Sequence, residues 1–282
     1  MTRPGRLHGA LRLARDHRFG VVGALTLALI ALAAIFALQL APAPPEKQAI
    51  QIALEGPSAG HPLGTDDLGR DIASRLLYGA RISLGVGIAA TFIATVIGVA
   101  GGLVSGYVGG WAETVIMRAA DVLLAFPTLV LAVAIVGVLG PSLPNATVAI
   151  AIAALPRFAR IIRAETVRLK AAEFIEAAVA IGVRDREILI RHVLPNTAGL
   201  IAVQFALSVA AAILNEASLG FLGLGVQPPT PSWGSMLRAG YPFVLQAPWI
   251  AVSSGLAISI TVLASTFVGD AIRDHLDPRL RR

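Results

Sequence analysis

The chain has 282 residues, of which 56% are hydrophobic and only 14% are charged. Soluble domains carry about 25% charged residues, so this composition excludes an ordinary water-soluble globule and indicates a polytopic membrane protein. The net charge of +6 does not indicate a nucleic-acid-binding protein, because the basic residues lie between apolar segments rather than on one module.

Six apolar segments are long enough to cross a bilayer, since a crossing helix needs about 20 apolar residues. None shows the two-residue alternation of a membrane β-barrel strand. The prediction is an all-α membrane protein with six transmembrane helices. They are placed at residues 20–41, 82–106, 115–140, 146–164, 197–220 and 248–270.

The first apolar segment follows a basic stretch, residues 1–19, as in a signal peptide. The run at 20–41 is longer than the usual apolar region of about 7–15 residues. The one tempting cleavage site, Ala41-Pro42-Ala43, is followed by two further prolines. We expect the segment to remain as the first transmembrane helix.

Residues 42–81 form the first long loop, which begins rich in proline and continues as HPLGTDDLGRDIASRLLYGARISL. Its aspartates lack the D-x-D-x-D-G pattern of a calcium loop. A structural network with the neighbouring arginines is favoured over a cation site. The residues concerned are Asp66, Arg70 and Arg75, with Asp67 and Asp71.

The second and third segments contain residues that suggest packing or transport roles. Five glycines in the second let helices approach closely, either within this chain or against another subunit. They are Gly85, Gly87, Gly98, Gly101 and Gly102. In the third segment Pro127 predicts a kink. Asp121 is a candidate for the translocation path, although a pair with Arg118 on the same helix face is favoured.

A polar insert, EFIEAAVAIGVRDREILIRHVLP, occupies residues 173–195. It predicts a short helix whose apolar side comprises Phe174, Ala177, Ala178 and Ile181. Gly182 would end this helix in the left-handed conformation. A second helix would begin at the N-cap Asp185, run through Val193 and stop before Pro195. Two interpretations of the insert remain open. It is either an amphipathic helix lying on the membrane or a packed cytoplasmic hairpin, or it is a knob that docks in a groove on a cytoplasmic partner.

The fifth segment carries a second candidate for the path, Glu216, near its end. A hydrogen-bonded structural carboxylate is the favoured alternative. After it, residues 221–247 are dense in glycine and proline, which predicts turns. Trp233, Tyr241 and Trp249 suit a membrane interface.

The lysines and arginines predict the orientation, because cytoplasmic loops carry an excess of them. With the N-terminus in the cytoplasm, 18 of the 23 basic residues lie on the inner side. This places 1–19, 173–195 and 271–282 in the cytoplasm. The division of the chain is a basic N-terminus (1–19), a first helix (20–41), an extracytoplasmic loop (42–81), a five-helix core (82–270) and a C-terminus (271–282).

The insert resembles a known family motif. Glu176-Ala177-Ala178, three residues, Gly182, nine residues and His192-Val193-Leu194-Pro195 are similar to the EAA loop of binding-protein-dependent ABC importer permeases. Four further blocks resemble the C-type permease of the dipeptide, oligopeptide and nickel branch. They lie at 63–84, 106–129, 216–237 and 269–280.

The resemblance implies a loop that seats in a cleft of an ATPase subunit. The coupling residues it implies are Glu173, Glu176, Ala177, Ala178, Gly182, Arg186, His192, Leu194 and Pro195. It also implies a bacterial inner-membrane location, a homologous second permease, two cytoplasmic P-loop ATPases and an extracytoplasmic binding protein. Dipeptides or oligopeptides are the expected cargo, with nickel chelates or glutathione as alternatives.

The sequence shows no motif for catalysis or for binding a cofactor or metal. It lacks the G-x-x-x-x-G-K-[ST] phosphate loop, so energy must come from another subunit or from a gradient. The resemblance implies ATP and magnesium on the partner ATPases. No catalytic, cofactor-binding or metal-binding residues are predicted, and no cysteine is present. The competing classes are a stand-alone secondary transporter, which usually has broken spans in matched halves, and an intramembrane enzyme.

Overall fold

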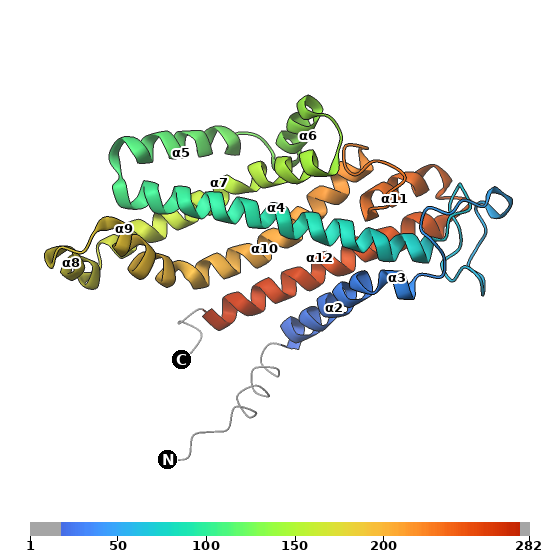
Figure 1. Cartoon of the computed structure of the whole chain (residues 1–282), viewed down its shortest axis with the longest axis horizontal. Coiled ribbons are helices and arrows are strands. Elements are labelled where there is room, and N and C mark those ends of the chain that lie inside the picture. The colour runs from blue at the N-terminus through green and yellow to red at the C-terminus, as the bar shows by residue number, and fades with distance from the viewer. Residues whose placement is uncertain (1–17, 277–282) are drawn as a thin grey trace, which may run out of the picture.

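The computed structural model describes residues 18–276, and within them the chain forms an elongated helical bundle (Figure 1). Most of the basic segment 1–19, and residues 277–282 of the C-terminal segment, lie outside the described residues. The elements are α2 (Arg18–Ile35), α3 (Ala37–Leu40), η1 (Ile50–Ile52), α4 (Ile72–Val108), α5 (Gly110–Leu124), α6 (Thr128–Leu139), α7 (Leu143–Lys170), α8 (Glu173–Ala180), α9 (Asp185–Glu187), η2 (Ile188–Val193), α10 (Leu194–Phe221), α11 (Trp233–Gly240), η3 (Tyr241–Phe243) and α12 (Pro248–Leu276).

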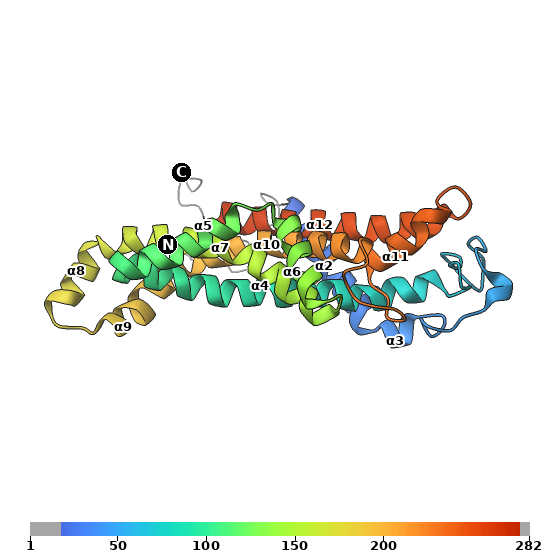
Figure 2. The same ribbon diagram turned by 90° about the horizontal axis from the view of Figure 1, so that it is seen from above.

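Five helical segments of the described chain are long and apolar enough to cross a membrane. They correspond to α2, α4, α7, α12 and one continuous run, Asp185–Phe221, that joins α9, η2 and α10. Counted together as one span, the bent pair of α5 and α6 brings the number to six. Figure 2 shows α8 and α9 projecting at one end of the bundle, here called the α8 end, and α11 with the 42–71 segment at the other, the α11 end.

The third span is broken rather than continuous from 115 to 140. Its two halves, α5 and α6, meet at an angle of 94°. Pro127 has an extended backbone and directly precedes α6. Because proline has no N–H and disfavours the helical conformation in the residue before it, the helix stops here and restarts. The kink predicted at Pro127 is confirmed.

The second span starts earlier than predicted. Its helix α4 begins at Ile72 instead of residue 82, so the last part of the 42–81 segment is helical. The carboxylate of Asp71 accepts a hydrogen bond from the Ser74 N–H at 2.7 Å and caps the first turn. The helix therefore begins ahead of the apolar run.

Glycines bring α4 into close contact with the helices beside it. A Cβ at Gly98 would lie 2.6 Å from the Cβ of Phe158, and one at Gly102 would lie 2.7 Å from the Cβ of Ile162. Gly87 meets Ile213 of α10 in the same way. These positions pack this chain internally, which decides between the two roles that the sequence left open for them. Gly85, in contrast, faces open space.

The 42–71 segment is held on the bundle by polar contacts. Asp66 accepts hydrogen bonds from the N–H groups of Leu68 and Arg70 at 3.0 and 2.9 Å. Its second oxygen lies 2.6 Å from Arg70 Nε and 3.5 Å from Arg75 Nε. The aspartate belongs to a loop network of the kind that the sequence favoured.

Candidate functional site

The polar insert 173–195 forms the tip of the α8 end (Figure 1). Its helix α8 buries Ile175 and Ala178. These side chains join a small core with Tyr107, Leu169, Ile188 and Val193. The insert is therefore a packed knob rather than a loose loop.

The buried side of α8 differs from the predicted one. Of the expected apolar side only Ala178 is buried, whereas Phe174 is 45% and Ile181 is 81% exposed. Apolar residues occur nearly all round this short helix, so periodicity alone cannot select a face. The ends of α4 and α7 make the selection by packing on Ile175. The correction leaves a second apolar face, with Phe174 and Ile181, open at the tip.

Gly182 ends α8 in the left-handed conformation, with φ of +80°. The Val183 N–H donates to the Ala178 carbonyl at 3.1 Å and the Gly182 N–H to that of Val179 at 2.9 Å. This pattern satisfies carbonyls at the helix end. The predicted conformation of Gly182 is confirmed.

Two predictions about the second half of the insert are wrong. Asp185 does not cap α9 with its side chain, because its carboxylate instead accepts a hydrogen bond from the Tyr107 hydroxyl at 2.9 Å. Pro195 does not end the helix, because α9 continues through the π-helical turn η2 into α10. The wider π turn accommodates a proline that cannot donate to the ladder.

The other predicted coupling residues are spread over the knob surface. Glu173, Glu176, Ala177, Gly182, Arg186 and Pro195 are exposed, and His192 and Leu194 are partly exposed. The His192 carbonyl accepts a hydrogen bond from the Asn196 amide at 2.6 Å. Sequence analysis missed two residues that hold the knob in place, Tyr107 and Lys170. The Nζ of Lys170 donates a hydrogen bond to the Tyr107 carbonyl at 2.6 Å. Only a prediction of contacts between distant segments would have found them.

Asp121 lies on α5, and its main partner is not the predicted one. The contact with Arg118 measures 3.9 Å, whereas Arg160 of α7 donates directly to the Asp121 carboxylate. Arg163 makes a parallel contact, with its Nε 2.8 Å from Glu113 Oε1. Two ion pairs thus tie the α8-end half of the broken span to α7.

Glu216 is 1% exposed and lies between α4, α10 and α11. Its carboxylate is near the hydroxyl groups of Ser83 and Ser232, but neither oxygen has a hydrogen bond of good geometry. The favoured interpretation was a hydrogen-bonded structural carboxylate. Glu216 is buried, but among the described residues its oxygens lack the hydrogen bonds that this interpretation requires.

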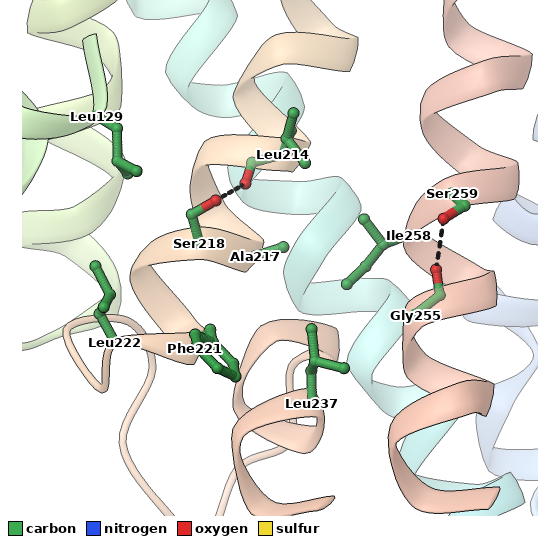
Figure 3. Close-up of a pocket in the computed structure, with 10 residues that line it drawn as sticks. All are labelled: Leu129, Leu214, Ala217, Ser218, Phe221, Leu222, Leu237, Gly255, Ile258 and Ser259. Carbon is green, nitrogen blue, oxygen red and sulfur yellow. Dashed lines mark hydrogen bonds between the residues drawn. The ribbon is translucent and has the colours of Figure 1, made fainter. Parts of the chain in front are cut away.

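An apolar pocket of about 450 Å³ lies beside α10 at the α11 end. It is formed by α6, α10, α11 and α12, with Leu129 and Leu222 on one side and Ile258 on the other (Figure 3). Glu216 does not line it. The hydroxyl groups of Ser218 and Ser259 donate to carbonyls of their own helices, both at 2.8 Å. The pocket therefore offers mainly apolar walls.

Comparison with known proteins is consistent with this architecture. Residues 98–282 match the model of the binding-protein-dependent transport system inner membrane component, and residues 6–57 match the N-terminal transmembrane domain of oligopeptide transport permease C. The chain belongs to this permease family. The resemblance drawn from the EAA loop is thereby confirmed.

Curated relatives cover nearly the whole permease. The dipeptide transport system permease protein of Alkalihalophilus pseudofirmus is 43% identical over 96% of this chain and 90% of its own. The glutathione transport system permease protein of Pectobacterium atrosepticum is 45% identical over 96% and 90%. The glutathione permease of Escherichia coli O6:K15:H31 is 46% identical over 97% and 91%.

A solved structure shows the same fold. The inward-facing MetNI methionine ABC transporter has a chain with a TM-score of 0.59 and 19% identity, covering 72% of this chain and 97% of that one. The permease is thus a multi-pass inner-membrane subunit of an ABC transporter, without catalytic activity of its own. Its system includes a binding protein and an ATPase, which binds the ATP. Membership excludes the stand-alone transporter and the intramembrane enzyme.

Proposed function

We propose that this permease imports peptides that an extracytoplasmic binding protein delivers, with dipeptides as the first cargo. The names of its relatives support this, since proteins 43–46% identical over 96–97% of the chain are called dipeptide and glutathione permeases. Glutathione is the runner-up, and nickel chelates remain the third alternative. Both termini and the knob lie in the cytoplasm, in agreement with the distribution of basic residues.

The observation that carries the coupling role is the open apolar face of α8. Phe174 and Ile181 project from a knob that otherwise packs well against α4 and α7. An exposed apolar patch rimmed by polar residues supports an interaction site. Each of two ATPases receives one such helix, one from this chain and one from a homologous second permease. Closure of the ATPases then moves the knob, and with it α10, because η2 joins them without a break.

The coupling role is tested with Ile181→Asp in the complete complex. A charge at the centre of an apolar contact should weaken ATPase binding about tenfold. Binding-protein-stimulated ATP hydrolysis should fall with it, while the amount of chain in the membrane stays unchanged. The matched control is Leu245→Asp, an exposed apolar residue at the opposite end. Equal ATPase retention in both variants would contradict the coupling role.

The cargo is tested separately, in nanodiscs that hold both permeases and both ATPases. Dialanine, S-methylglutathione and a nickel–histidine chelate are compared for stimulation of ATP hydrolysis through the loaded binding protein. The first compound should stimulate most strongly. Stimulation by the nickel chelate alone would overturn the peptide assignment.

A further inference from the structure

A charged groove of about 490 Å³ separates α5 from α7 in the half of the bundle nearer the α8 end. Three guanidinium groups, those of Arg118, Arg160 and Arg163, and two carboxylates, those of Glu113 and Asp121, line it. One positive charge is therefore left over. Thr114 and Met117 complete the lining.

The ion pairs do not use all the hydrogen-bonding capacity of the groove. Arg160 is held by Asp121 and Arg163 by Glu113, yet an arginine has five N–H donors. The side chain of Arg118 is 81% exposed, and its one ionic contact within the described residues is that with Asp121 at 3.9 Å. Donors and acceptors thus remain available in the same groove.

Arg157 adds a second unbalanced charge one turn along α7 toward the α11 end. It is exposed, and within residues 18–276 its guanidinium has no hydrogen-bond or ion-pair partner. Arg157 and Arg160 are three residues apart, so they lie on the same face of the helix. The exposed strip of α7 is consequently basic.

The depth of Arg157 can be estimated from α4. Arg81 donates to the Ala34 and Ile35 carbonyls at 2.7 and 2.9 Å, at the end of α2. Gly101 lies twenty residues after Arg81 on α4, which corresponds to about 30 Å along the helix. This length equals the thickness of the hydrocarbon layer. Gly98, inside that limit, packs on Phe158, the neighbour of Arg157. With Arg81 placed at the outer boundary, Arg157 therefore lies near the cytoplasmic boundary of this layer, in agreement with its place among the inner basic residues.

An exposed guanidinium near this boundary can meet a charged group that passes toward the cytoplasm. The α5–α7 groove beside Arg157 carries both positively and negatively charged side chains. A zwitterionic peptide matches it, since its terminal carboxylate pairs with guanidinium groups and its ammonium with Asp121 or Glu113. A nickel chelate offers no equivalent pair of termini.

We infer that the α5–α7 groove, together with Arg157, is an inner binding site for the termini of a zwitterionic peptide on its way to the cytoplasm. The inference rests on the proposed peptide cargo. It names the chemical group that the permease itself recognises, the free carboxylate, in addition to any selection by the binding protein.

The absence of cysteine from the chain makes a direct test clean. In a Met117→Cys variant, the introduced thiol reacts with an anionic methanethiosulfonate reagent. Mass analysis of this chain measures the rate of that reaction. The nucleotide-free complex in nanodiscs is used without binding protein. Dialanine should slow the reaction, and its C-terminal amide should not. Adding Arg157→Gln should raise the dialanine concentration needed for protection about tenfold, whereas the control Arg168→Gln, outside the groove on the same helix, should leave it unchanged.

Three results would overturn the inference. Reaction of the introduced thiol only in the isolated chain would show that the second permease covers the groove. Reaction that depends on anionic lipid and not on dialanine would assign the groove to a lipid headgroup. Equal protection by dialanine and its amide would exclude recognition of the carboxylate. If dialanine still stimulates ATP hydrolysis through the binding protein in any of these cases, the proposed function stands and only the inner site falls.

Discussion

The Tyr107 hydroxyl donates a hydrogen bond of 2.9 Å to Asp185, which lies 78 residues further along the chain. This bond joins the last turn of α4 to the first turn of α9. Because α9 continues into α10, the knob is attached to two membrane helices, α4 and α10. If α8 has the proposed coupling role, this bond belongs to the connection between the knob and the spans.

Tyr107→Phe removes this bond and keeps the packing of the ring. The loss of one such hydrogen bond costs about 1 kcal/mol, so the knob should remain folded but less firmly attached. We expect ATP hydrolysis to continue while peptide uptake per ATP falls. Both rates are measured on the same proteoliposomes, with Tyr241→Phe at the opposite end as the control. Unchanged uptake per ATP in Tyr107→Phe would contradict a mechanical role for the bond.

Gly182→Ala tests the left-handed turn after α8. No atom lies within 4 Å of the added Cβ, so the cost arises from φ of +80° and not from a clash. An L-residue in this conformation costs about 1–2 kcal/mol. ATPase association should weaken modestly and insertion should be normal. Gly137→Ala, which also faces open space but has no positive φ, is the matched control and should have no effect.

Features that depend on neighbouring residues in the sequence were predicted correctly. Apolar length identified the spans, the missing N–H of Pro127 predicted the bend, and glycine at 182 predicted the end of α8. The partners of Asp121 and Asp185 were not predictable in this way. Arg160 and Tyr107 are 39 and 78 residues away from them and reach them only through the packing of α7 and α4.

The prediction of the buried face of α8 was wrong for a related reason. A short helix with apolar residues nearly all round has no unique stripe, so its neighbours choose Ile175 over Phe174. The continuity through Pro195 also depends on context, because α10 is held by other helices on its remaining length. The insert 173–195 was thus recognised from the sequence as one segment, while the contacts of its residues required the fold.

Gly102→Ala tests the close packing of α4 on α7. Its Cβ would lie 2.7 Å from the Ile162 Cβ and 2.8 Å from the Ala159 carbonyl oxygen, and the second of these atoms belongs to the backbone. Overpacking of this kind costs about 1–3 kcal/mol. The melting temperature of the purified permease should fall. Gly101→Ala meets only Ile116 at an ordinary 3.6 Å and should not lower it. Equal melting temperatures for the two variants would show that α4 and α7 can separate at little cost.

Asp66→Ala tests the network that holds the 42–71 segment on the bundle. Arg70 and Arg75 are both buried beside Asp66, and the substitution leaves them without their main counter-ion. Breaking a buried ion pair from one side costs about 3–5 kcal/mol, so limited proteolysis should cut the segment much faster than in the unmodified chain. Asp67→Asn is the neighbouring control, because in the described part of the chain Asp67 has a single ionic contact, at 3.6 Å. If a cation rather than the arginines held these aspartates, a chelator would accelerate cleavage of the unmodified protein. The network predicts no effect of the chelator, since guanidinium groups already supply the positive charge that Asp66 needs.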